Sequence, residues 1–138
     1  MTNTTVQGRP IADGRGEGEV LRSDEPISFY GAVDTDTGEF IEEGHALTGK
    51  NVADKVLVFP KGKGSTVGSY VLYGLAQNDV APAAIVNEHT ETIVATGAIL
   101  GEIPCVDDLE VPLDHLEDGA RVVVDGDEGT VEVLQDGG

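Results

Sequence analysis

A glycine-rich segment in the middle of the chain carries the residues best suited to chemistry. It runs from Pro60 to Thr66, after an apolar run at 56–59 and before residues with helical spacing that reach Gln77. At such a strand–loop–helix junction, the free amides and the dipole at the helix start favour an anion, and glycines let a ligand approach the backbone closely. The segment therefore predicts a binding site for a small anionic molecule.

Lysines gather around this segment. Four of the eight basic residues, Lys50, Lys55, Lys61 and Lys63, lie between positions 50 and 63 of a chain that has 26 acidic residues. A local excess of positive charge in so acidic a chain again indicates an anionic ligand.

The segment does not follow the common nucleotide-binding motifs. A P-loop requires Gly-Lys-Ser or Gly-Lys-Thr, which is absent, and in the dinucleotide pattern Gly-x-Gly-x-x-Gly the third glycine would come one residue before Gly68. No histidine or aspartate lies close enough in sequence to indicate a serine-hydrolase triad. In the simplest alternative, Ser65 or Thr66 is only the N-cap of the following helix.

The rest of the pattern predicts one mixed, β-rich α/β domain around this loop. Strands alternate with two helices in the middle and pair as hairpins at the ends, which suggests a mixed sheet or half-closed barrel with helices packed on it. Pro104 suggests that its strand lies at an edge. We expect a flexible N-terminal segment at 1–13 and a single domain at 14–138. The expected strands are 18–22, 27–30, 39–41, 56–59, 83–86, 103–106, 121–124 and 130–134, and the expected helices are 67–77 and 92–100.

The composition excludes several classes of protein. With 138 residues, of which 39% are hydrophobic, the chain suits one ordinary folded domain. Its net charge of −18 repels phosphates and anionic lipid headgroups, so we expect no nucleic acid or membrane partner. The absence of a signal-peptide pattern and of a long apolar stretch predicts a cytoplasmic protein. Because the acids are scattered, adaptation to high salt, as in a halophile, is favoured over an acidic face for a basic partner.

The other conspicuous residues have simpler interpretations than chemistry. Cys105 is the only cysteine, so the chain alone holds no disulfide and no iron–sulfur cluster, and a packed thiol is expected. His45 and His115 have no partners at metal-ligand spacing, and we expect no metal site. Asp125 and Gly126 indicate a hairpin turn, since the spaced ligands of a calcium loop are missing.

Several ordered stretches resemble the small subunit of aconitase X. The resemblance extends over roughly 14–133, nearly the whole chain, and the glycine-rich segment is similar to the signature of that family. Ordered motifs over this length are far more specific than one glycine loop. The matching stretches are 23–31 (SDEPISFYG), 33–38 (VDTDTG), 45–49 (HALTG), 60–72 (PKGKGSTVGSYVL), 81–85 (APAAI) and 95–99 (ATGAI).

The resemblance implies a fold, a partner and a reaction. The fold is a swivelling β/β/α domain like the mobile domain of aconitase, and the activity is that of a hydro-lyase that works only with a larger subunit, as a heterodimer or higher assembly. In archaea such a pair dehydrates (R)-5-phosphomevalonate to trans-anhydromevalonate 5-phosphate, in a mevalonate pathway to isoprenoids. The family implies that the large subunit binds a 4Fe-4S cluster on its own cysteines, where the iron acts as a Lewis acid on the departing hydroxyl.

The resemblance also assigns roles within the loop. In this superfamily the first serine after the last glycine of the loop removes a proton from the substrate, and here that residue is Ser65. A serine hydroxyl is a weak base, so helix-start amides, the loop lysines and exclusion of water would favour its anion. We expect Lys63, Gly64 and Thr66 to bind the substrate. The family often has arginine in place of Lys63, so no bidentate contact is expected there, and serine in place of Thr66, which keeps a hydroxyl.

Three alternatives stay open at this point. Related aconitase X enzymes dehydrate cis-3-hydroxyproline, although those tend to be fused chains. The tail after Ile99 also resembles swivelling phosphohistidine carrier domains, but Glu91, Thr92 and Ile93 stand where a carrier has its histidine, and His89 lies a few residues early. The third alternative is an interaction domain without catalytic activity.

Overall fold

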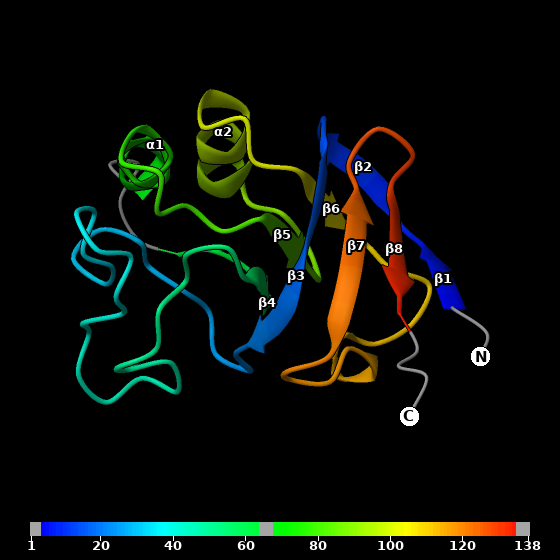
Figure 1. The fold of residues 1–138 in the computed structure, drawn as a ribbon, viewed down its shortest axis with the longest axis horizontal. Helices are drawn as coiled ribbons and strands as arrows, with labels where there is room; N and C mark the ends of the chain where they lie inside the picture. Colours follow the sequence, from blue (N-terminus) through cyan, green and yellow to red (C-terminus); the bar gives the residue numbers. More distant parts are fainter. Residues whose placement is uncertain (1–3, 64–67, 135–138) are drawn as a thin grey trace.

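Two layers of strands and one layer of helices are stacked in the order β/β/α (Figure 1). The computed structural model describes residues 4–63 and 68–134. Within these residues, eight strands are hydrogen-bonded in the order β1-β8-β7-β3-β4-β5-β6-β2. The β-rich, mixed α/β class and the β/β/α layering expected from the sequence are confirmed.

The central layer is a mostly parallel sheet. β3 (Arg15–Arg22), β4 (Val56–Phe59), β5 (Ala84–Asn87) and β6 (Cys105–Asp107) run parallel, and β2 (Arg9–Ala12) pairs antiparallel with β6. Two helices follow β4 and β5 and cover one face of this sheet (Figure 1): α1 (Gly68–Gln77) and α2 (Thr92–Leu100). The carboxyl ends of the parallel strands share one edge, which is where ligand sites form in sheets of this kind.

The outer layer is antiparallel. β1 (Thr4–Gln7), β8 (Thr130–Val133) and β7 (Arg121–Asp125) pair in that order, and β7 pairs with the first half of β3. The second half of β3 pairs with β4, so this one strand belongs to both layers. A 3-10 turn, η1 (Leu113–His115), lies between β6 and β7.

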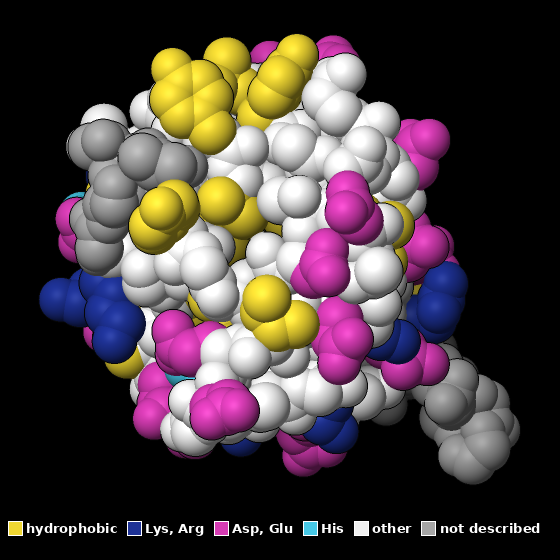
Figure 2. All heavy atoms as spheres, turned by 90° about the vertical axis from the view of Figure 1, so that its left-hand side faces the viewer, with side chains coloured by type: hydrophobic (Ala, Val, Ile, Leu, Met, Phe, Trp, Pro, Cys, Tyr) yellow, Lys and Arg dark blue, Asp and Glu magenta, His cyan; other side chains and the backbone are white. Residues whose placement is uncertain are grey.

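The surface carries the charge of the chain. Figure 2 shows Asp and Glu side chains over the lower and right-hand parts of one face, whereas hydrophobic side chains gather along its upper part, at the height of the helices. No helix in the described part of the chain is long and apolar enough to cross a membrane.

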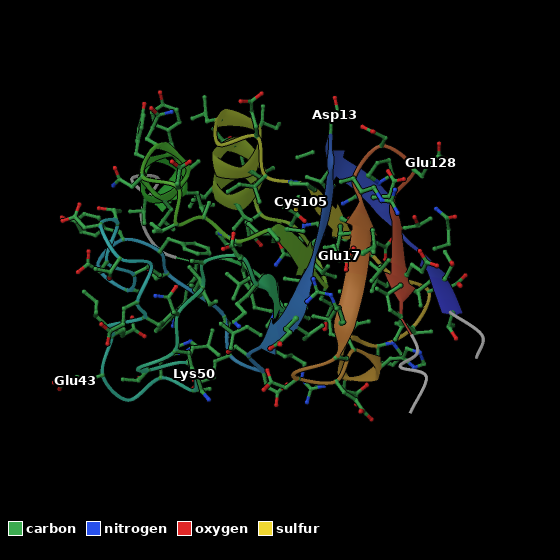
Figure 3. All side chains as sticks on the ribbon, in the orientation of Figure 1. Asp13, Glu17, Glu43, Lys50, Cys105 and Glu128 are labelled. Atoms are coloured by element: carbon green, nitrogen blue, oxygen red, sulfur yellow. The ribbon has the colours of Figure 1, made fainter. Side chains whose placement is uncertain are left out.

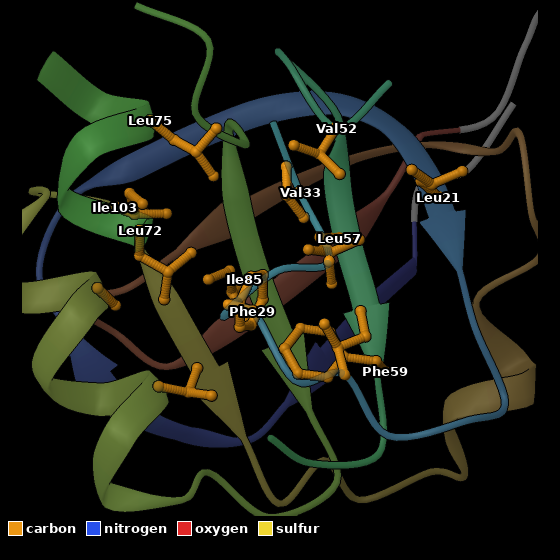
Figure 4. Close-up of a cluster of buried hydrophobic side chains, with 14 of the residues drawn as sticks. Leu21, Phe29, Val33, Val52, Leu57, Phe59, Leu72, Leu75, Ile85 and Ile103 are labelled. Carbon is orange, nitrogen blue, oxygen red and sulfur yellow. The ribbon is translucent and has the colours of Figure 1, made fainter. Parts of the chain in front are cut away.

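Two hydrophobic clusters join the three layers. On the helix side, Leu57 and Ile85 from the central sheet meet Leu72 and Leu75 from α1 (Figure 4). Between the sheets, the core is mainly valine, and Val56 on β4 packs in the same cluster as residues of β7 and β8. β4 is therefore buried on both faces, which explains its uninterrupted apolar sequence. Each such side chain contributes roughly 1.5–3 kcal/mol when fully buried.

A long connection between β3 and β4 packs without forming a strand. It spans residues 23–55 and makes only isolated bridges, yet it buries Ile27, Phe29, Phe40 and Leu47. Its apolar residues complete the helix-side cluster. The strand predicted at 27–30 is wrong, because only Ile27 bridges to the loop after β4.

The N-terminus also differs from the sequence prediction. The flexible segment expected at 1–13 is in fact paired from residue 4 to 12, as β1 beside β8 and β2 beside β6. Val6 and Ala12 are buried, which anchors both strands. Because β2 takes the outer position, β6 is not the edge strand that Pro104 suggested.

Candidate functional site

The loop between β4 and α1 leaves the carboxyl edge of the parallel sheet. Lys61 and Lys63 are exposed on its first part, and Gly62 between them is buried. The predicted site residues Gly64, Ser65 and Thr66 lie outside the described residues, so their positions stay predictions. The described surroundings show what would hold them.

A bridge to the connection after β3 fixes the first part of the loop. The Ile27 amide donates to the Lys61 carbonyl at 3.2 Å, and the Lys63 amide donates to the Ile27 carbonyl at 3.0 Å. Ile27 itself is fully buried. Lys63 is therefore held at its backbone while its side chain remains in solvent.

The turn between β5 and α2 holds the loop from the other side. The Pro60 carbonyl accepts from the amides of Glu88 and His89 at 3.0 and 3.1 Å. At the ends of the two strands, the Asn87 side-chain amide donates to the Phe59 carbonyl at 3.0 Å. Asn87 is fully buried, and its Oδ1 has no hydrogen-bond partner among the described residues.

A buried carboxylate holds the turn between β5 and α2 in place. Asp107, at the end of β6, accepts both Nε and Nη2 of Arg9 at 2.9 Å and the Thr90 amide at 2.7 Å. Burial opposes ionisation of Asp107, but the hydrogen bonds from Arg9 and Thr90 and the charge of Arg9 outweigh it and hold the pKa below its usual value. The ion pair on β2 and β6 is thus connected through the turn to Pro60 and the loop.

Helix α2 packs directly against both ends of the loop. A Cβ at Gly62 would lie 2.5 Å from Val94 Cγ2, and one at Gly68 would lie 3.3 Å from Ile93 Cγ2. The same Cβ at Gly68 would lie 3.8 Å from the Tyr30 amide nitrogen. Only glycine lets the chain pass this close at Gly62.

The positive charge at the loop is smaller than the sequence suggested. Lys61 and Lys63 follow β4. Lys55 precedes β4, and its Nζ lies 3.6 Å from Glu19 Oε2. Lys50 lies on the long connection, far from α1 in Figure 3. Of the four clustered lysines, two therefore remain as candidates for an anion at the loop.

The cysteine and the possible metal-ligating side chains of the described residues are scattered. Cys105 is buried in β6 (Figure 3), and burial, partly offset by the hydrogen bond with Thr90, raises the pKa of its thiol to about 12. No group of three or more His, Cys, Asp or Glu side chains in the described ranges could hold a metal ion. The residues present therefore do not fit an iron–sulfur cluster bound by this chain.

The His45 side chain holds the connection between β3 and β4 together. Its Nδ1 accepts from the Leu47 amide at 3.1 Å and its Nε2 donates to the Pro26 carbonyl at 3.2 Å. The ring also packs against Phe40, with centroids 4.6 Å apart and the ring planes tilted by 35°. It thereby fixes the connection that carries Ile27.

Comparison with known proteins identifies the family. The sequence profile of the aconitase X swivel domain matches residues 5–133. The chain belongs to the aconitase X swivel-domain family. The resemblance seen in the sequence is therefore confirmed.

Solved structures agree with the swivel-domain assignment. The crystal structure of Thermococcus kodakaraensis aconitase X in its holo-form superposes with a TM-score of 0.91 at 48% identity, over 96% of this chain and 99% of that chain. A solution NMR structure of a UPF0107 protein superposes with a TM-score of 0.85, also at 48% identity, over 96% of this chain and 100% of that one.

Curated relatives of the swivel domain carry a functional name. The Methanosarcina mazei protein is 58% identical over 99% of this chain and 96% of its own length, and the Thermococcus kodakarensis protein is 51% identical over 96% and 98%. Both are called phosphomevalonate dehydratase small subunit.

Sequence reasoning missed the residues that support the loop. Arg9 and Asp107 are 98 positions apart, and Arg9 fell in a segment expected to be flexible. The signal for Asp107 and Asn87 was a polar residue directly after a buried apolar run, at the carboxyl end of a predicted strand.

Proposed function

We propose that this chain is the small subunit of a two-subunit dehydratase that converts (R)-5-phosphomevalonate to trans-anhydromevalonate 5-phosphate. The observation that carries the proposal is the near-full-length similarity, at 51–58% identity, to small subunits named for this activity. Their names imply a larger partner, and the lack of cluster ligands in the described part of this chain agrees with one.

In this proposal the loop after β4 supplies the base. The anion of Ser65 takes a proton from the carbon next to the one that bears the hydroxyl, the C–H electron pair becomes the double bond, and hydroxide leaves from the neighbouring carbon. Ser65 then returns its proton to solvent. The helix-start amides and the positive loop would favour the serine anion in a site closed to water.

The same loop would bind the substrate. Lys63 is an exposed cation held at its backbone by Ile27, and it would contact the phosphate or carboxylate as a point charge. Gly64 and Thr66 would add backbone and hydroxyl contacts at the start of α1. The cofactor we propose is a 4Fe-4S cluster on the large subunit, which supplies a Lewis acid for the leaving hydroxyl.

Dehydration by the assembled pair tests this function. The chain is mixed in high salt with its anaerobically reconstituted large subunit, phosphomevalonate is added, and the loss of water is followed by NMR and mass spectrometry. The expected product is anhydromevalonate phosphate, formed only when both subunits are present. An assembled pair with an intact cluster that leaves phosphomevalonate unchanged contradicts the substrate, and cis-3-hydroxyproline is then the compound to test.

A further inference from the structure

The two helices carry no charged side chain. α1 (GSYVLYGLAQ) and α2 (TIVATGAIL) contain no Asp, Glu, Lys, Arg or His, although 25% of the chain is charged. The solvent side of a surface helix is normally polar and charged. The outer side of this layer is therefore unlike the rest of an otherwise strongly acidic surface.

Large hydrophobic side chains project from these helices. The exposed fractions are 67% for Tyr70, 40% for Tyr73, 60% for Ile99 and 45% for Leu100, and we call these four residues the helical face. The hydrophobic side chains along the upper part of Figure 2 lie at the height of these helices. Uncharged surface rich in tyrosine is typical of the core of a protein interface, where charged residues are depleted.

An open groove adjoins the helical face. It has a volume of about 610 Å³ and lies between the end of α2 and the turn from β2 to β3. Ile11, Ala98 and Ile99 give it apolar walls, and Asp13 and Glu102 stand at its side. Such a groove suits a partner side chain with an apolar stem and a positive end, such as lysine or arginine.

The helical face begins beside the proposed catalytic loop. Tyr70 stands in the first turn of α1, and the amide nitrogen of the exposed Tyr30 would lie 3.8 Å from a Cβ at Gly68, at the start of that helix. A partner that closes the loop to water would therefore extend onto this surface.

We propose that the helical face and its groove form the docking surface for the large subunit, an inference that rests on the proposed two-subunit function. The partner surface is expected to be uncharged where it meets the tyrosines and to place a basic side chain beside Asp13 and Glu102. A second copy of this chain fits less well, because each copy has a net charge of −18 and no basic residue on its own helices to meet the acidic groove.

Binding of variants to the large subunit tests the docking surface. Ile99→Lys and Tyr73→Lys place a charge within the helical face, and at Ile99, near the C-terminus of α2, a positive charge does not oppose the helix dipole. Each variant is expected to raise the Kd for the large subunit about tenfold or more, measured by sedimentation or biolayer interferometry in constant high salt. Ile41→Lys is the matched control, since Ile41 is 48% exposed but lies on the long connection. Its Kd is expected to change less than about threefold.

The outcomes separate this inference from the proposed function. If both helical-face variants keep a native-like Kd, and circular dichroism shows that both are folded, the proposed docking surface alone is overturned. The same follows if Ile41→Lys weakens binding as much as Ile99→Lys. A native chain that does not bind the large subunit at all overturns the two-subunit function as well. If the native chain self-associates and Ile99→Lys abolishes that self-association, the helical face is assigned to a second copy of this chain instead.

Discussion

The Asp107 carboxylate joins segments that are far apart in the sequence. It receives Arg9 from the N-terminal strand and the Thr90 amide from the turn before α2, and its side chain has no exposed surface. A carboxylate held in this way is stabilising only while it is ionised. Since its pKa is lowered in the folded chain, its contribution is present above the ordinary carboxyl pKa and is lost as the pH falls through the folded value.

We predict that Asp107→Asn lowers the free energy of unfolding by about 1–3 kcal/mol at neutral pH, as expected for lost hydrogen bonds to a charged group. The difference from the native chain should begin to shrink as the pH falls below about 4, where the carboxyl of the unfolded chain takes up a proton, and it is lost once the pH falls through the lowered pKa of the folded carboxyl. Urea unfolding at fixed salt from pH 3 to 7 measures both. Asp108→Asn is the control, since Asp108 is exposed and has a φ of 51°, which asparagine tolerates. An equal loss in the control, or a loss that does not depend on pH, contradicts the role of Asp107.

Lys63 is the candidate contact for the anionic group of the substrate. We predict that Lys63→Gln raises KM by roughly tenfold or more, as for loss of one charge-assisted hydrogen bond, and that Lys63→Arg restores most of the affinity. Steady-state kinetics of the assembled enzyme at constant salt give both values. Lys55→Gln removes the same charge at the opposite end of β4, where Lys55 lies near Glu19, and should leave KM unchanged. A KM that does not respond to Lys63→Gln rules out this contact.

At the scale of elements, Gly97 lets the two helices pack closely against each other. A Cβ at Gly97 in α2 would lie 2.6 Å from Leu72 Cδ1 and 3.1 Å from the Ser69 Cα in α1. The two helices would have to move apart to admit this Cβ. Because α2 packs against both ends of the loop, that movement would also disturb the contacts that hold the loop.

We predict opposite effects for two glycine-to-alanine changes in these helices. Gly97→Ala should lower the free energy of unfolding by about 1–3 kcal/mol, because overpacking outweighs the gain in helix propensity. Gly74→Ala, where the nearest atom is Thr35 Cγ2 at 3.5 Å, should raise it by about 0.5–1 kcal/mol. Chemical denaturation of the isolated chain measures both. A stabilising Gly97→Ala would mean that the helices are not packed this closely.

At the scale of the whole molecule, like charges repel one another across a small domain. The net charge is −18, and the described ion pairs are few and mostly exposed. Counterions screen such repulsion over about 10 Å at 0.1 M salt and about 3 Å at 1 M. The folded state therefore gains from salt more than an ordinary domain does.

We predict that the Tm of the isolated chain rises by roughly 5–10 °C between 0.05 and 1 M KCl, the shift that about 2 kcal/mol produces in a domain of this size. Differential scanning calorimetry over this range gives the dependence. A Tm that stays constant or falls would contradict adaptation of this chain to high salt.

Much of the fold follows from local sequence patterns. The apolar runs of β4 and β5, the helical spacing of α1 and α2 and the valine-rich hairpin of β7 and β8 were predicted because each carries its own periodicity. β1 and β2 were missed because short, polar edge strands are defined by their partners. The strand predicted at 27–30 failed for a related reason, since Ile27 and Phe29 are buried by packing under the helices without a pairing strand.

Some residues of the candidate site could be predicted from the sequence, and others could not. The loop and Lys63 were found from local composition, whereas the support from Asp107, Asn87 and Ile27 depends on contacts between distant segments. Ser65 was assigned through the family resemblance, and the lysine excess was overestimated because β4 separates Lys55 from the loop.

The most direct test of the account is the turnover of the assembled enzyme with Ser65→Ala. If Ser65 accepts the substrate proton, kcat should fall by about 10²–10⁴-fold, as for loss of a general base, while the Kd for the large subunit stays native. Thr66→Ala serves as the neighbouring control and should act mainly on KM, because its proposed role is substrate binding. An alanine variant at position 65 that retains full kcat would contradict the account and leave Ser65 as a cap of α1.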